Sequence, residues 1–129
     1  MTIRKRIALA AAALALGSGL AVLPATSASA ATYTCHYSTS GDYAYAGYYS
    51  GTTVQPSTTV VTTSGIEAQC LLRRSGYNPG TIDGVFGSNS QAAAKAFQKD
   101  MNDVFSAGLD EDGKIGKESW PWLRRLAHL

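Results

Sequence analysis

The chain lacks most of the residues from which catalytic and metal sites are built. It has two histidines and two cysteines among 129 residues, and charged residues make up only 16%. The histidines, His36 and His128, lie far apart in the sequence, whereas a zinc site needs several clustered ligands. No G-x-S-x-G nucleophile elbow is present, and a chain of this length allows one small domain. These absences disfavour an enzyme and predict neither a cofactor nor a metal.

An acidic run at residues 110–115 resembles part of a calcium-binding loop. Aligning Gly113 with the invariant sixth position of such a loop places Gly108 at position one and Ser119 at position twelve. A calcium loop requires an Asp and a bidentate Glu at those two positions. Two ligands are therefore missing, and a solvated acidic turn is the better interpretation.

The chain also lacks a surplus of charge of either sign. Its formal net charge is +2, but three of the cations lie within the first six residues, at Arg4, Lys5 and Arg6. The residues that follow carry eight Lys and Arg against nine Asp and Glu, a net charge of −1. A nearly neutral protein has no broad electrostatic surface for nucleic acid or anionic lipid. We expect no nucleic-acid partner, and recognition by shape and hydrogen bonds.

The first thirty residues have the three-part layout of a secretory signal peptide. Residues 1–6 are basic, residues 7–23 form an Ala- and Leu-rich run, and Ala28-Ser29-Ala30 fits the small-x-small cleavage pattern. The apolar run is at the short limit for a helix that spans a membrane. We predict cleavage after Ala30, and a secreted, extracellular protein with no membrane segment.

Export determines how the cysteines are interpreted. In an oxidising compartment, two cysteines most simply form one disulfide, here between Cys35 and Cys70. Cys70 lies off the apolar stripe of the helix predicted around it, so its side chain faces the preceding segment. A catalytic cysteine with His36 as its base is the disfavoured alternative, because sequence neighbours are poorly placed for a thiolate–imidazole pair.

Composition changes sharply near residue 65. Residues 31–65 hold 18 Ser, Thr or Gly, six of the seven tyrosines and a single charge, Asp42. Residues 66–129 hold both tryptophans, all three phenylalanines and every Leu and Ile that follows the signal peptide. We predict that residues 31–64 form a loose extended arm and linker, with a short hairpin around Gly47, and that residues 65–129 form the folded domain.

Three helices are predicted in the folded domain. The first covers residues 65–75 and starts at the capping box Ser64–Glu67, and the second runs from the capping box Ser88–Gln91 to about Met101. The third covers residues 118–127, with Pro121 tolerated in its first turn.

An internal repeat connects these helices. Residues 83–90 and 112–119 share the frame D-G-x-Φ-G-x-x-S at a spacing of 29 residues, and each copy precedes a helix. The first glycine permits a positive φ, and the apolar residue, Phe86 or Ile115, plugs the core. The predicted fold is mainly α. It is a compact three-helix bundle with two D-G-x-Φ-G loops, preceded by a Tyr/Ser/Thr-rich extended arm tied on by a disulfide.

Residues 65–126 resemble the type 1 peptidoglycan-binding domain family, a compact three-helix module. The residues that carry this resemblance are Gln69, Leu72, Gly76, Tyr77, Pro79, Gly80, Ile82, Asp83, Gly84, Phe86, Gly87, Ser90, Ala93, Phe97, Gln98, Gly108, Leu109, Asp112, Gly113, Ile115, Gly116, Ser119, Trp120 and Leu123. Ser90 and Ser119 stand where the family usually has Thr, and the stretch between Gln98 and Asp112 is a few residues longer. The resemblance implies peptidoglycan, through its stem peptide or its glycan, as the ligand.

Polar and aromatic residues beside the two loops are the candidate binding residues. The candidates are Tyr77, Asp83 and Trp120, with Arg73 and Gln98 as donors at the rim. Two alternatives stay open at this point. Tyr77 and Trp120 are also suited to a core, and Asp83 to holding its own turn.

These observations predict a small secreted monomer that binds peptidoglycan and catalyses no reaction. The alternative is a protein-interaction module, an inhibitor or adaptor of a secreted cell-wall hydrolase, which would use the tyrosine-rich arm. Tyrosines present an apolar face with a hydroxyl, which suits sugar rings, a protein partner or packing onto the core.

Overall fold

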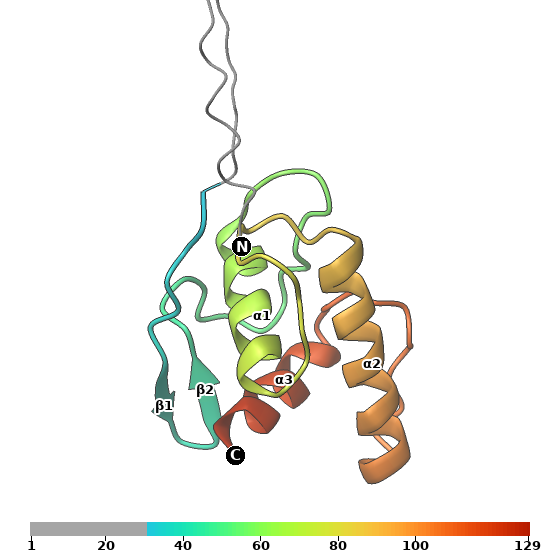
Figure 1. The fold of residues 1–129 in the computed structure, drawn as a ribbon. Coiled ribbons are helices and arrows are strands. Elements are labelled where there is room, and N and C mark those ends of the chain that lie inside the picture. Colours follow the sequence, from blue (N-terminus) through green and yellow to red (C-terminus); the bar gives the residue numbers. More distant parts are fainter. Residues whose placement is uncertain (1–30) are drawn as a thin grey trace, which may run out of the picture. The chain divides into compact units, whose positions relative to one another are not determined.

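Three helices and one short hairpin make up the part of the chain that the structure describes (Figure 1). The structure is a computed structural model that describes residues 31–129, so the predicted signal peptide lies outside the described residues. The elements in chain order are β1 (Ser38–Ser40), β2 (Tyr43–Tyr45), α1 (Thr63–Arg74), α2 (Ser88–Phe105) and α3 (Ser119–His128). The predicted fold class is confirmed: a mainly α protein of three helices with a short stranded arm.

The helices pack around one core. In Figure 1, α1 and α2 lie side by side and α3 crosses beside their lower ends, while the hairpin lies on the other side of α1. The two loop plugs are both in this core, since Phe86 is 1% exposed and Ile115 is 0% exposed. No helix within residues 31–129 is both long enough and apolar enough to cross a bilayer.

The predicted capping boxes are wrong, although the helices that they were expected to start are present. Thr62, two residues before Ser64, caps α1: its hydroxyl accepts a hydrogen bond from the Gly65 N–H at 2.9 Å. Glu67 does not reach back to the helix end because its carboxylate is buried and bound elsewhere. Gly87, which has no side chain to offer, occupies the cap position of α2.

The second helix is also longer than predicted. It continues one turn past Met101 to Phe105 and ends where Ser106 takes up a left-handed conformation, with φ of 53°. Val104 and Phe105 in this last turn are exposed, although their places three and four residues after Met101 continue the apolar stripe of the helix. The end of α1 follows the prediction, because Gly76 has a φ of 94° just past the helix.

The hairpin is displaced from its predicted position. Its turn is at Gly41 and Asp42 rather than at Gly47, and Ser38 pairs with Tyr45 in an antiparallel register. Gly41 has a φ of 59°, which suits a tight turn. In β2 the alternation of the sequence places Ala44 in the core at 1% exposure, with its neighbouring tyrosines half-buried.

A disulfide and a buried ion pair attach the arm to the helices. Cys35 and Cys70 are bonded, with their Cα atoms 5.7 Å apart, as predicted. The carboxylate of Glu67 on α1 lies 2.9 Å from the guanidinium of Arg124 on α3, and both side chains are 0% exposed. The arm is therefore part of the packed unit, residues 32–129, rather than a loose appendage.

Candidate functional site

The first D-G-x-Φ-G loop, residues 83–87, is held by one glutamine of α1. Gln69 donates through Nε2 to the Val85 carbonyl at 3.0 Å and to Ser90 Oγ at 3.0 Å, and its Oε1 accepts from the Gly84 N–H at 2.8 Å. Asp83 Oδ1 accepts from the Val85 N–H at 3.0 Å and from Gln69 at 3.2 Å. The buried amide therefore has all its hydrogen-bonding groups satisfied by the loop.

The second loop, residues 112–116, repeats this arrangement bond for bond. Gln98, 29 residues after Gln69, donates to the Lys114 carbonyl at 2.8 Å and to Ser119 Oγ at 3.1 Å, and accepts from the Gly113 N–H at 2.9 Å. Asp112 Oδ1 accepts from the Lys114 N–H at 3.0 Å and from Gln98 at 3.3 Å. The repeat in the sequence is thus a repeat of a complete hydrogen-bonded framework.

A glycine is required at the second position of each loop. Gly84 has a φ of 82° and Gly113 a φ of 76°, in the region that other residues avoid. A Cβ on Gly113 would lie 2.7 Å from the backbone oxygen of Gln91, which is closer than such atoms approach. The D-G pair therefore fixes the path of the loop and its close approach to α2.

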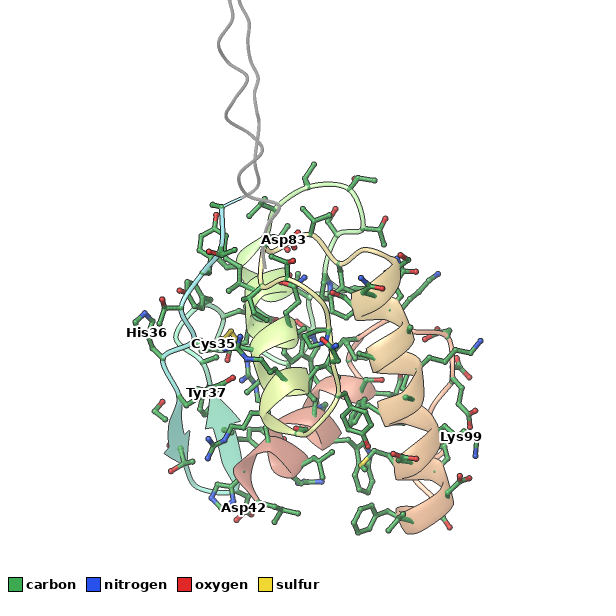
Figure 2. All side chains as sticks on the ribbon, viewed as in Figure 1. Cys35, His36, Tyr37, Asp42, Asp83 and Lys99 are labelled. Atoms are coloured by element: carbon green, nitrogen blue, oxygen red, sulfur yellow. A yellow bond between two sulfur atoms is a disulfide. The ribbon has the colours of Figure 1, made fainter. Side chains whose placement is uncertain are left out.

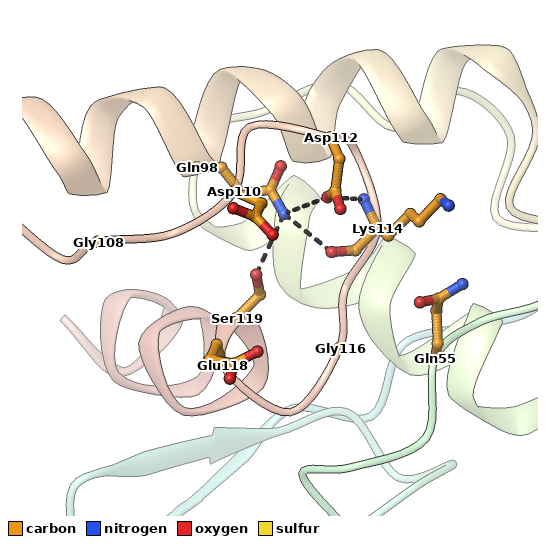
Figure 3. A pocket seen from close by; sticks show the side chains of 9 residues that line it. All are labelled: Gln55, Gln98, Gly108, Asp110, Asp112, Lys114, Gly116, Glu118 and Ser119. Atoms are coloured by element: carbon orange, nitrogen blue, oxygen red, sulfur yellow. Dashed lines mark hydrogen bonds between the residues drawn. The ribbon is translucent and has the colours of Figure 1, made fainter.

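Each loop borders a pocket, and the two pockets correspond residue by residue. The first-loop pocket is lined by Gln69, Pro79, Thr81, Asp83, Val85, Gly87, Asn89 and Ser90, together with Gly80 and Ser88. The eight residues that lie 29 positions later than the first eight line the second-loop pocket, which Figure 3 shows. The second-loop pocket also includes Gln55 from the arm. The fold therefore presents the same site twice.

The two pockets differ in size and in charge. The second-loop pocket has a volume of about 340 Å³, against about 140 Å³ for the first-loop pocket. Where the first-loop pocket has Thr81, Val85 and Asn89, the second-loop pocket has Asp110, Lys114 and Glu118. Ligand pockets usually measure about 300–1,000 Å³, so only the second-loop pocket is large enough for a small ligand.

The charges of the second-loop pocket are not paired with one another. The ion pairs within residues 31–129 are Lys99–Asp103 and Glu67–Arg124, and neither lies in this pocket. Figure 3 shows Asp110 and Glu118 on one side of the pocket in this view and Lys114 on the other. Exposed groups of both signs are thus available to a ligand.

The arm braces only the first loop. The Phe86 N–H donates to the Ser57 carbonyl at 2.9 Å, the Thr62 N–H to the Gly84 carbonyl at 3.2 Å and the Tyr33 N–H to the Ile82 carbonyl at 2.9 Å. No backbone hydrogen bond of this kind joins the arm to residues 110–116 in the described part of the chain. The backbone of the second loop is therefore less constrained by the arm than that of the first loop.

Two of the candidate residues hold the loops rather than face a common groove. Asp83 bonds within its own turn and lines the first-loop pocket, and Figure 2 shows it far from the hairpin turn at Asp42. Gln98 is 1% exposed and lines the second-loop pocket with an amide that the loop already binds. Each acts on its pocket by positioning the loop.

The other three candidates line neither pocket. Trp120 is 0% exposed, and its indole N–H donates to the Val54 carbonyl at 2.8 Å, so it belongs to the core and is no ligand-facing residue. Arg73 donates to the sulfur of Cys35 at 3.2 Å, beside the disulfide. The five predicted residues therefore do not form one groove.

Tyr77 is held at the surface by a single acidic partner. Its hydroxyl donates to Asp100 Oδ2 at 2.6 Å, and its ring packs edge-on against Phe97. Burial, followed by the hydrogen bond to Asp100 and the charge of that carboxylate, raises the pKa of Tyr77 to about 12. This bond joins the loop after α1 to the middle of α2.

Sequence reasoning missed the charged residues of the second-loop pocket. Asp110 was weighed only as a calcium ligand, and Lys114 and Glu118 were not considered. The signal was present in the repeat, because comparing residues 29 apart shows that these positions change from neutral to charged. Residues 31–129 contain no group of three or more His, Cys, Asp or Glu arranged to hold a metal ion.

A known family shares this framework. Residues 65–123 match the model of the family described as "Putative peptidoglycan binding domain". The match covers both loops and both of their glutamines, and it leaves out the arm.

One solved structure is also similar to this chain. It is a crystal structure of a peptidoglycan-binding protein from Clostridioides difficile in complex with glutamine hydroxamate. The two proteins are 29% identical, with a TM-score of 0.52, over 66% of this chain and 60% of that one. The chain thus spans less than two thirds of the length of its relative.

Proposed function

We propose that the protein is exported and binds peptidoglycan without transforming it, and that the second-loop pocket contacts the stem peptide. The family match over residues 65–123 supports the ligand class. The observation that carries the choice of site is the contrast between the pockets, because only the second-loop pocket combines a volume of about 340 Å³ with unpaired charges of both signs.

The charges favour the peptide part of the wall over its sugars. A stem peptide offers ammonium and carboxylate groups, which complement Asp110 or Glu118 on one side of the pocket and Lys114 on the other. Glutamine hydroxamate, with which the structural relative was crystallised, also carries an ammonium and a carboxylate on one carbon. This chemistry supports a ligand with both charges.

The two pockets supply matched variants for the test. The variant Asp110→Thr, Lys114→Val, Glu118→Asn gives the second-loop pocket the side chains of the first. Because the first loop carries these side chains on the same framework, the variant should fold normally. We expect it to lose co-sedimentation with purified sacculi, whereas the reciprocal variant Thr81→Asp, Val85→Lys, Asn89→Glu should sediment like the parent.

Two results would contradict the proposal. If the triple variant of the second-loop pocket still sediments like the parent, the three charges that it removes do not hold the wall. If the parent does not sediment at all, the protein does not bind peptidoglycan in this form. Export has a separate test: the intact mass of secreted protein should correspond to a chain that starts at Ala31, and recovery of full-length protein in membranes would contradict it.

A further inference from the structure

The arm carries a pocket of its own, outside residues 65–123 and therefore outside the family match. This arm pocket has a volume of about 360 Å³ and is lined by Tyr45, Tyr48 and Tyr49, with Ser38, Gly47 and Ser50. It is as large as the second-loop pocket but contains no Asp, Glu, Lys, Arg or His. The three tyrosines are half-buried, so part of each remains open to solvent.

The rings that line the arm pocket are held in place. The Tyr48 hydroxyl donates to the Thr34 carbonyl, and the Tyr49 hydroxyl accepts from the backbone N–H groups of Thr53 and Val54 at 3.1 and 2.9 Å. The ring of Tyr45 lies 4.4 Å from the guanidinium carbon of Arg124. Rings that are already immobilised lose little freedom when a ligand stacks on them.

The backbone beneath the tyrosines is fixed by the buried ion pair. Glu67 accepts from the N–H groups of Ala46, Tyr48 and Tyr49 at 2.8, 3.0 and 3.2 Å. Arg124 uses all its N–H groups, donating to Glu67 and to the carbonyls of Ala44, Tyr49 and Gly51. A buried ion pair adds little net stability, and its best-supported use is to select one conformation. Here it selects the conformation of residues 44–51.

We propose that the arm pocket binds a neutral saccharide ring. The flat faces of tyrosine suit the apolar face of a sugar, and the hydroxyls of Ser38 and Ser50 suit its hydroxyl and amide groups. The absence of lining residues that are charged at neutral pH complements an uncharged ligand rather than a stem peptide, and the arm, residues 31–64, contains one charge, Asp42. The protein would then contact peptide and glycan at two sites, and such bivalence strengthens binding to a wall.

A peptide-free probe separates this site from the second-loop pocket. The purified protein is titrated with a soluble oligosaccharide of N-acetylglucosamine, and backbone amide shifts are followed by NMR. We expect shifts at residues 45–50 and none at 110–118. Because this probe has no stem peptide, its binding does not depend on the proposed function of the second-loop pocket.

Three variants test the pocket itself. Tyr45→Leu keeps apolar volume but removes the flat ring, and we expect about a two- to tenfold loss of affinity for the oligosaccharide. Ser38→Trp fills the pocket from an exposed position on β1 and should abolish binding. The matched control is Tyr43→Leu, since Tyr43 is on the same strand and also half-buried near an arginine, but lies outside the pocket.

The outcomes are distinct. Weakened binding in the first two variants with parental binding in Tyr43→Leu supports the saccharide site. Failure of the parent to bind the oligosaccharide, or equal binding by the parent and the Ser38→Trp variant, overturns it. Loss of binding in all three variants also overturns it, because it would indicate general loosening of the arm, which the NMR spectrum would show.

Discussion

The loop at residues 83–87 and the loop at residues 112–116 are held by the same hydrogen bonds but have different neighbours. In both, one glutamine and one aspartate satisfy the loop backbone, and one apolar residue enters the core. The first loop is bonded to the arm at Gly84 and Phe86, and at Ile82 just before it, and its pocket is small, with Asp83 as its one charged lining residue. The second loop has no such bonds within residues 31–129, and its pocket is larger and charged.

This difference indicates how two copies of one framework can have different roles. The residues that satisfy buried polar groups in the framework are the same in both copies, and the residue that fills the core is apolar in both, Phe86 or Ile115. Besides Pro79 and Gly108, the positions that differ are Thr81, Val85 and Asn89 against Asp110, Lys114 and Glu118, and the framework uses none of these six through its side chain. We infer that the first copy has become an attachment point for the arm, which leaves the second copy open.

The largest effects should come from the two core plugs. Phe86→Ala should lower the free energy of unfolding by about 3–5 kcal/mol and Ile115→Ala by about 2–5 kcal/mol, since both side chains are buried and leave cavities. Urea denaturation of both variants measures this. A cost below about 1 kcal/mol for either residue would show that its loop does not pack on the core as described.

Removal of the disulfide should have the next largest effect and should separate the two loops. The bond closes a loop with a sequence separation of 35 residues, for which chain entropy gives about 3–4 kcal/mol. In the variant Cys35→Ala, Cys70→Ala, we expect faster hydrogen exchange at residues 82–86, which the arm braces, than in the parent.

Residues 111–115 provide the internal control for that experiment. They have no backbone bond to the arm in the described chain, so their exchange should change less than that of residues 82–86. Equal acceleration in both loops would mean that the arm stabilises the whole domain rather than its first loop.

The two glutamines should be equivalent in stability. Gln69→Ala and Gln98→Ala each remove the acceptor of a buried glycine N–H, and a buried unsatisfied group costs about 1–3 kcal/mol. We expect the two costs, measured by urea denaturation, to agree within about 1 kcal/mol. A clearly larger cost for one glutamine would show that the frameworks share geometry but not energetics.

The helices, loops and disulfide could be predicted because local patterns determine them. Apolar spacing located the helices, the D-G pairs located the loops, and two cysteines in an exported chain left one simple pairing. The helix starts were mispredicted because Ser64 and Glu67 satisfy a capping pattern that longer-range contacts override. Glu67 instead binds Arg124 and the arm backbone, and its partner lies 57 residues away.

The candidate site was harder to predict because its residues have no common local signal. Tryptophan is a residue type common in ligand-binding sites. Trp120, however, is buried by the arm, whose packing depends on Glu67 and Arg124. The charged residues of the second-loop pocket could be identified from the sequence only by comparing the two copies of the repeat position by position. The arm pocket is lined by tyrosines of a segment that the sequence predicted to be a loose arm. The contacts that fix this segment to the helices had no signal in the sequence.

The smallest predicted effect concerns a contact that the repeat does not duplicate. The Tyr77 hydroxyl donates to Asp100, and the residues 29 positions after this pair are Ser106 and Leu129, which cannot repeat it. Tyr77→Phe should therefore remove only this bond, and because both groups are partly solvated the cost should be about 0.5–1 kcal/mol. Wall binding should stay at the parental level, since Tyr77 lines neither loop pocket.

The pH dependence of the stability cost of Tyr77→Phe shows which protonation state of Tyr77 the folded protein favours. The folded pKa of Tyr77 is about 12, raised first by burial and then by Asp100, whereas a free tyrosine ionises near 10. The neutral phenol is therefore favoured by folding, and its contribution is complete below about pH 10 and lost as the pH rises towards 12. The difference in unfolding free energy between the parent and Tyr77→Phe should be constant from about pH 7 to 9 and shrink above pH 10. If the difference in unfolding free energy instead grows above pH 10, the fold favours the ionised form of Tyr77. That result would contradict a hydrogen bond from the Tyr77 hydroxyl to Asp100.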